Sequence, residues 1–255
     1  MDPRYSLTGL LVGLLIGVTG VGGGSLMTPI LILLVGIKPT VAVGSDLAYA
    51  AITKIVGGIQ HRRQGMVDHR IVWQLAVGSV PGALLGVWFV HHMQHRLGDQ
   101  VQHIVLRLLG IMLIVVALAL FLRSTPLVGV LKKRLHAVRN THPLLLAIVS
   151  GLLGFLFGVT SIGSGSLFGV ILIVVYGLSS HKMVGTDVYH AAIITVCAAG
   201  AHVWAGNVDY ALVGNLLIGS IPGVLIGSKL SSKLPDKVLR PLLASVLLAS
   251  GIKMI

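Results

Sequence analysis

Long apolar runs separated by short polar breaks follow one another along the whole chain. A helix needs about 20 apolar residues to cross the roughly 30 Å of hydrocarbon in a bilayer. Runs of that length lie near residues 41–61, 70–91, 101–122, 182–204, 210–230 and 238–255. Two longer stretches, near 7–36 and 144–178, are too long for one span and too short for two. The pattern predicts an all-α polytopic membrane protein.

The amino-acid composition excludes a soluble globular protein. Of the 255 residues, 55% are hydrophobic and 10% are charged, against roughly 25% charged in an ordinary soluble domain; the mean hydropathy is +0.96. The formal net charge of +12 does not indicate nucleic-acid binding, because Lys and Arg lie in the breaks between apolar runs and report membrane orientation. The single cysteine, Cys197, excludes an internal disulfide and a thiolate metal site.

The chain contains an internal duplication at a constant offset of 141 residues. The segment GLLIGVTGVGGGSL at 13–26 matches GFLFGVTSIGSGSL at 154–167, and the match continues without a gap. Matched pairs include Asp46 and Asp187, His61 and His202, and Asp68 and Asp209. We expect a first repeat at 1–122, a basic connector at 123–142 and a second repeat at 143–255. The apolar N-terminus has the outline of a signal peptide, but it belongs to the first repeat and should be retained.

Each repeat opens with a glycine-rich segment that disfavours a continuous helix. The centres read GVTGVGGGS and GVTSIGSGS. We expect two half-helices that meet at a loop inside the membrane and return to their own side. With this topology most Lys and Arg gather on one side, as the positive-inside rule requires. Each repeat then crosses an odd number of times, so the repeats have inverted topology, as in many secondary transporters.

The connector combines basic residues with apolar residues at helical spacing. Leu127, Leu131, Leu135 and Val138 lie among basic residues from Arg123 onward. This pattern indicates a cytoplasmic helix that lies on anionic lipid.

These motifs resemble those of the sulfite exporter TauE/SafE family of membrane permeases. The resemblance rests on GLLIGVTGVGGGSLMTPIL near the N-terminus, on GSD and GTD in the following spans, and on the matched segments 61–68 and 202–209. It covers nearly the whole chain. It implies a permease of the bacterial inner membrane that carries a small sulfur-containing anion such as sulfite, thiosulfate or an organosulfonate. The identity of the anion and the direction of transport stay open.

The broken segments are the candidate anion site. A half-helix that starts inside the membrane directs unpaired N–H groups and the positive end of its dipole into the loop. Two such ends with nearby hydroxyls suit the oxygens of sulfite or a sulfonate. The candidate substrate-binding residues are Thr19, Gly22, Gly23, Gly24, Ser25, Ser45, Thr160, Ser161, Gly163, Ser164, Gly165, Ser166 and Thr186. The alternative is that these small residues only let helices pack closely.

Two aspartates at matched positions inside spans are the candidate coupling residues. An ionisable residue at membrane depth is costly and is a functional hypothesis by default. Asp46 and Asp187 could carry a coupled proton, with Lys54 and His190 neutralising an aspartate or relaying its proton. The TauE/SafE family more often has an uncharged residue here, so the aspartates depart from its pattern. The alternative is that each aspartate caps the N-terminus of its own helix.

Other matched polar residues have simpler interpretations. His61 and His202 lie at span ends, where a histidine is an interfacial hydrogen bonder or, alternatively, a ligand or pH sensor. Asp68 and Asp209 precede apolar runs and are expected to cap helices. The histidines at 91–95 have metal-like spacing, but they have no copy in the second repeat, and adventitious binding is the better interpretation.

The leading hypothesis is alternating-access transport of a small sulfur-containing anion, without catalytic residues, metal or cofactor. An anion channel is the first alternative, although a channel needs a continuous wet path rather than an occluded site. An intramembrane hydrolase would use Ser164 as nucleophile with His190 or His202 as base, but no third orienting group is evident. The expected partners are the anion and the lipid bilayer, without nucleic acid; a homodimer is compatible with the sequence.

Overall fold

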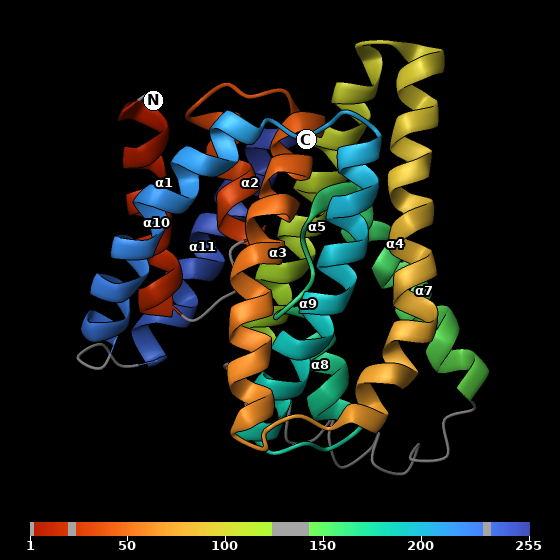
Figure 1. Ribbon diagram of the computed structural model, residues 1–255, viewed down its shortest axis with the longest axis vertical. Helices are drawn as coiled ribbons and strands as arrows, with labels where there is room; N and C mark the ends of the chain where they lie inside the picture. The colour runs from red at the N-terminus through yellow and green to blue at the C-terminus, as the bar shows by residue number, and fades with distance from the viewer. Residues whose placement is uncertain (1–2, 20–23, 124–142, 232–235) are drawn as a thin grey trace.

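A computed structural model describes residues 3–19, 24–123, 143–231 and 236–255. Within these ranges the chain is helical and contains no strand (Figure 1). The helices are α1 (Pro3–Thr19), α2 (Gly24–Leu33), α3 (Pro39–Arg63), α4 (His69–Leu97), α5 (Gln100–Arg123), α7 (Pro143–Thr160), α8 (Leu167–Val174), α9 (Ser180–Trp204), α10 (Tyr210–Ser231) and α11 (Asp236–Met254). The expected all-α class is confirmed. The interfacial helix expected in the connector lies outside the described residues.

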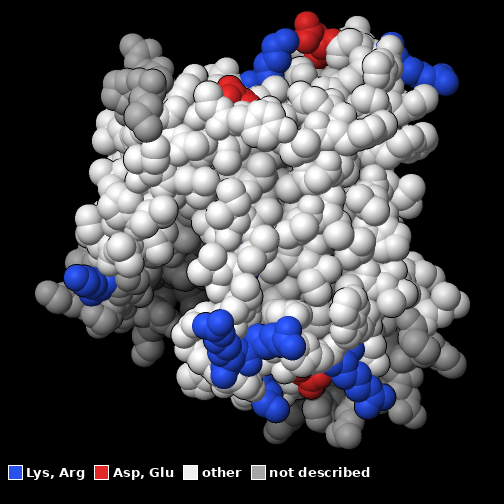
Figure 2. Space-filling model, in the orientation of Figure 1, with Lys and Arg blue, Asp and Glu red and all other residues white. Residues whose placement is uncertain are grey.

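The outer surface is that of a membrane protein. Among the described residues, 4 helices are long and apolar enough to cross a membrane: His69–Leu97, Gln100–Phe121, His181–Trp204 and Tyr210–Gly227. Figure 2 shows a broad uncharged band, with most of the visible Lys, Arg and Asp side chains toward its two ends. Such a band is what the hydrocarbon region of a bilayer requires. We call the end that carries Lys38 and the C-terminus the upper end, and the end that carries Arg62 and Arg70 the lower end.

Both glycine-rich segments are divided between two helices, as the sequence predicts. α7 ends at Thr160 and α8 begins at Leu167. The turn 161–166 between them, called the crossover turn below, contains positive φ angles at Ser161, Gly163 and Gly165. In the first half α1 and α2 are likewise separate helices. In Figure 1, α1 descends from the upper end and α2 returns to it, whereas α3 then runs to the lower end.

Helices from the two halves of the chain pack against each other in corresponding pairs. α1 lies on α10 and α4 lies on α7, while α3 packs on α9 and α5 packs on α11. The contacts recur at the offset of the duplication. A Cβ atom on Gly13 would collide with the backbone of Ser220, and a Cβ atom on Gly154 would collide with the backbone of Ser79. These glycines therefore let the paired helices approach closely.

The two predicted helix caps are confirmed. Asp68 precedes α4, and its Oδ1 accepts a hydrogen bond from the N–H of Ile71 at 3.3 Å. Asp209 precedes α10, and its Oδ1 accepts from the N–H of Leu212 at 3.0 Å. Each carboxylate satisfies one of the backbone donors that a helix start leaves unpaired.

We expect the substitution Gly82→Ala to lower the thermal unfolding midpoint of the purified protein. A Cβ atom on Gly82 would collide with the carbonyl oxygen of Gly151, so α4 and α7 must move apart, at a cost of roughly 1–3 kcal/mol. Gly200→Ala, in α9, is the matched control, because no described atom lies within 4 Å of its added Cβ. Helix propensity alone makes Gly→Ala stabilising by about 0.5–1 kcal/mol. Equal shifts for both variants would contradict the close approach of α4 and α7.

Candidate functional site

The carboxylate of Asp46 joins α3 to α2 and to the crossover turn. Asp46 is fully buried, and its Oδ2 accepts hydrogen bonds from Thr28 Oγ1 at 2.8 Å and from Ser161 Oγ at 2.6 Å. Its second oxygen, Oδ1, is also buried and has no hydrogen-bond partner within the described ranges. A carboxylate can accept about four hydrogen bonds. Asp46 therefore keeps one oxygen for a proton or for a further donor.

The start of α2 packs directly on the crossover turn. A Cβ atom on Gly24 would lie 3.1 Å from Ser161 Oγ and 3.4 Å from Asp46 Oδ2. Ser161 itself has a φ of 60°, a left-handed conformation that costs a non-glycine residue about 1–2 kcal/mol. Its hydrogen bond to Asp46 holds it there. The two broken segments of the chain therefore meet at Asp46.

Lys54 brings a positive charge to the same region from the lower half of α3. Its Nζ donates to Ser164 Oγ at 2.7 Å and to Thr195 Oγ1 at 3.4 Å, and it lies 5.5 Å from the centre of the Phe157 ring. The carboxylates of Asp46 and Asp187 both act electrostatically on Lys54. Lys54 thus connects α3, the crossover turn and α9 at one point.

The second aspartate and His190 lie on α9, on the other side of this region. Asp187 is buried, and His190 is fully buried with its Nε2 2.8 Å from Ser79 Oγ. The His190 ring packs against Phe168, with 4.7 Å between ring centres. Its Nδ1 has no hydrogen-bond partner in the part of the chain that the structure describes. His190 therefore keeps one ring nitrogen that is able to exchange a proton.

The alternative that Asp46 and Asp187 cap their own helices is wrong. α3 begins at Pro39 and α9 begins at Ser180, so each aspartate lies about two turns inside its helix. A side chain at that depth cannot reach the unpaired N–H groups of the first turn. The helices begin earlier than the apolar runs because Pro39 is a favoured first helical residue and Ser179 precedes α9 in an extended conformation.

Ser45 and Thr186, two predicted substrate ligands, join the two halves. Ser45 Oγ accepts a hydrogen bond from the N–H of Asp209, and Thr186 Oγ1 accepts one from the N–H of Asp68, both at 3.0 Å. Both hydroxyl groups are fully buried. Each can still donate its hydrogen to a substrate, but its oxygen is already bound in a contact between α3 or α9 and the other half.

Thr160 and Ser25, two further predicted ligands, lie beside the meeting point. Thr160 Oγ1 donates to the carbonyl of the preceding turn at 2.6 Å and so helps to end α7. Ser25 is buried in the first turn of α2. Thr19 is the last residue of α1, and its side chain is outside the described part, as are Gly22 and Gly23.

His202 is a buried hydrogen bonder rather than an interfacial one. Its Nε2 lies 2.9 Å from the carbonyl oxygen of Gly158, which can only accept, so Nε2 carries the hydrogen. Its Nδ1 then accepts from Asn207 Nδ2 at 3.5 Å. Its matched residue, His61, is only half-buried at the lower end of α3.

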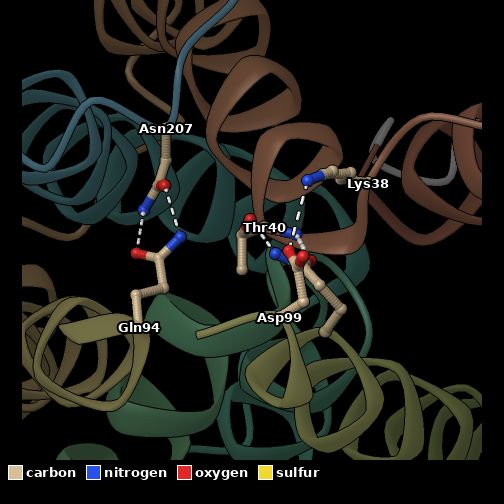
Figure 3. A network of polar contacts seen from close by, with 6 residues as sticks. Lys38, Thr40, Gln94, Asp99 and Asn207 are labelled. Atoms are coloured by element: carbon tan, nitrogen blue, oxygen red, sulfur yellow. Dashed lines mark hydrogen bonds and ion pairs between the residues drawn. The ribbon is translucent and has the colours of Figure 1, made fainter. Parts of the chain in front are cut away.

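A polar network lines a cavity of about 390 Å³ at the upper end (Figure 3). Gln94 of α4 and Asn207, after α9, exchange two amide hydrogen bonds of 3.0 and 3.4 Å. We call this pair the upper clasp, because it joins the first half of the chain to the second. Lys38 Nζ also forms an ion pair with Asp99 Oδ1 at 3.2 Å. The backbone N–H of Thr40 donates to Gln102 Oε1, and Gln102 Nε2 donates to Thr40 Oγ1, both at 3.1 Å.

In the described residues, Ser164 pairs with neither of the two histidines that the hydrolase alternative requires as its base. Ser164 Oγ is bound by Lys54, while His190 pairs with Ser79 and His202 with a backbone carbonyl. The histidines at 91–95 contain one close pair, with the Nε2 atoms of His91 and His95 3.2 Å apart. Within the described residues no group of three or more His, Cys, Asp or Glu could hold a metal ion.

Sequence reasoning missed several members of this region. Thr28 and Thr195 were not candidates, although Thr195 corresponds to Lys54 at the offset of 141. That correspondence could have identified Thr195, because a residue close to the symmetry axis of a duplicated fold contacts the equivalent residue of the other repeat. Gln94 and Asn207 carried no signal, since an amide in a polar break is typical of any loop.

Comparison with known proteins places this architecture in a family. The profile described as "Sulfite exporter TauE/SafE" matches residues 5–254. The chain belongs to the TauE/SafE family. It is 41% identical to the probable membrane transporter protein YjnA of Bacillus subtilis, over 100% of both chains. It is 27% identical to YdhB of the same organism, over 90% of each chain, and 30% identical to y4hK of Sinorhizobium fredii, over 86% of this chain and 85% of that one.

These relatives are all described as probable membrane transporter proteins. With the apolar helices of the structure, the TauE/SafE match makes the chain a membrane transporter. No solved structure matches the chain.

Proposed function

We propose that the protein is a secondary transporter that moves a small sulfur-containing anion, such as sulfite, thiosulfate or an organosulfonate, by alternating access. The observation that carries the proposal is the meeting of the start of α2 with the crossover turn, where hydroxyl groups contact the buried Asp46 and the half-buried Lys54. Helix starts inside a membrane favour anions. The family profile, described as a sulfite exporter, supports the proposed substrate class.

Reciprocal contacts support two inverted repeats, at 1–122 and 143–255, joined by the connector at 123–142. Gly44, near the start of α3, approaches Asn207 after the end of α9, and Gly185, near the start of α9, approaches Met66 after the end of α3. α3 and its counterpart α9 therefore run antiparallel, as Figure 1 also shows. Matched helices that run in opposite directions are what an inverted duplication produces.

The charges at the two ends support an orientation in the bacterial inner membrane. Arg62, Arg63 and Arg70 lie at the lower end, together with the start of α9, which carries Lys182. The upper end has fewer basic residues, and there Lys38 is paired with Asp99. By the positive-inside rule the lower end faces the cytoplasm. The upper clasp then lies on the outer side.

The charges around Lys54 support coupling to protons. With both aspartates ionised, Asp46, Asp187 and Lys54 together carry one net negative charge. A monovalent anion that enters alone adds a second negative charge at membrane depth, which is costly. If one aspartate takes up a proton as the anion binds, the net charge of the site does not change. We therefore infer one proton for each monovalent anion, with His190 beside Asp187 as a group able to relay it.

Flux in proteoliposomes tests this function. Uptake of labelled sulfite, thiosulfate and a small sulfonate is compared in vesicles with and without the purified protein, with and without a pH gradient. We expect saturable uptake of at least one of these anions, inhibited by the unlabelled anion. Absence of uptake for all of them would contradict the substrate class. A flux that does not saturate and reaches channel rates would favour the anion channel instead.

A further inference from the structure

The two broken segments are not equivalent, although the sequence makes them copies. Around Asp46 both hydroxyl donors, Thr28 and Ser161, are bound to one carboxylate oxygen. The residues at the corresponding positions of the duplication are Gly169 and Gly20, which have no hydroxyl group. The two hydroxyl donors beside the start of α2 therefore already bind an anionic group, the side chain of Asp46.

The start of α8 has a different set of groups. Ser166 immediately precedes α8, is 3% exposed, and makes no side-chain hydrogen bond to the first turn. Its Oγ has no hydrogen-bond partner in the ranges that the structure describes. Two residues earlier, Ser164 Oγ is bound by the ammonium group of Lys54. The Lys54 ammonium group, the unpaired buried hydroxyl of Ser166 and the positive end of the α8 dipole therefore come together along residues 164–166 of the crossover turn.

Among the described residues, only the first half of the chain supplies a cation to this group of residues, through Lys54. The position that corresponds to Lys54 is Thr195, and the two side chains contact each other. A lysine in both repeats would supply two cations, whereas this arrangement supplies one. An ammonium group is a point charge with three donors, without the fixed fork of a guanidinium group, so it can bind an oxyanion and release it again.

We propose that the transported anion binds at the start of α8, on the Lys54 ammonium group and the hydroxyl groups of Ser164 and Ser166. This assignment rests on the proposed transport of a small sulfur-containing oxyanion. In the anion-free protein Lys54 serves as the counter-charge of Asp46 and Asp187. The anion takes over this counter-charge when it binds, which links its binding to the protonation of an aspartate. Lys54 is thereby the residue that selects a negatively charged substrate.

Steady-state uptake of the anion that wild type carries best tests the assignment. We expect Lys54→Met to raise KM by roughly 10–100-fold, because a charged hydrogen bond and ion pair are lost. Ser166→Ala should raise KM by roughly 3–10-fold for the loss of one hydroxyl donor. Thr53→Val is the matched control on the same helix, because Thr53 is exposed and its hydroxyl donates to carbonyl groups of its own helix. Its KM should stay within about twofold of wild type.

Thermal stabilisation by the same anion provides a second readout for each folded variant. Lys54→Arg keeps the charge and is used if Lys54→Met does not fold; it should retain binding with a smaller increase of KM. An unchanged KM in the folded lysine variants would overturn the proposal. Equal increases for Ser161→Ala and Ser166→Ala would overturn the inequivalence of the two ends. If wild type carries none of the anions, the transport proposal fails instead, so the two failures are distinguishable.

Discussion

Replacing Asp46 by asparagine is expected to abolish the accumulation of anion that a pH gradient drives in proteoliposomes. With one proton for each monovalent anion, a gradient of one pH unit can sustain roughly tenfold accumulation, since one unit corresponds to about 1.4 kcal/mol. Asparagine keeps a carbonyl oxygen that can accept from Thr28 and Ser161, but it cannot bind or release the proton. The variant should therefore only equilibrate the anion, to a ratio of about one.

Asp187→Asn should have the same effect if both aspartates must change their charge during the cycle. Asp99→Asn is the control, because Asp99 is exposed and paired with Lys38 at the upper end, away from the buried charges. Accumulation in the Asp99 variant should equal that of wild type. Tenfold accumulation that persists in both Asp46→Asn and Asp187→Asn would contradict proton coupling through these residues.

Locking the upper clasp is expected to stop transport. Gln94 belongs to the first half and Asn207 to the second, and both side chains line the upper cavity. Alternating access requires the outer side to open in part of each cycle. The test uses the double variant Gln94→Cys and Asn207→Cys in a Cys197→Ser background, joined by a short thiol-specific cross-linker that reduction can cleave. The cross-linked protein should lose more than about 90% of its flux, because the outer path can then no longer open. Reduction should restore the flux.

The matched control is the pair Thr40→Cys and Gln102→Cys. These residues line the same cavity and are joined by two hydrogen bonds, but both belong to the first half. Cross-linking them should leave most of the flux intact. Full flux in the cross-linked Gln94 and Asn207 pair would show that the clasp does not open during the cycle.

Much of the fold could be predicted because it depends on local pattern. The apolar runs gave the helices, since a membrane span needs a fixed length of apolar chain. The glycine-rich centre of the second repeat was correctly expected to break, and the positive φ angles of Gly163 and Gly165 give the physical reason. Asp68 and Asp209 were correctly read as caps because a cap depends only on neighbouring residues.

The roles of side chains inside the helices were harder to predict. The cap interpretation of Asp46 and Asp187 stayed open because the apolar runs begin near 41 and 182, after the observed helix starts at Pro39 and Ser180.

Contacts between distant residues depend on how the two halves meet. The duplication predicts that residues 141 positions apart are equivalent, but it does not say which equivalent residues touch. Lys54 reaches Ser164 and Thr195 because α3 and α9 pack closely and the crossover turn lies beside them. The hydroxyl of Thr28, four residues into α2, could be assigned to Asp46 only from the structure.

The location of a bound anion shows whether the substrate binds at the start of α8. Crystals of the protein soaked in selenite, the selenium analogue of sulfite, at a concentration that competes with anion uptake, would reveal selenium by its anomalous scattering. We expect a peak between the two halves, within hydrogen-bonding distance of the Lys54 ammonium group and the start of α8. A peak confined to the upper cavity or to the lipid-facing surface, or no peak at a concentration that saturates transport, would contradict it.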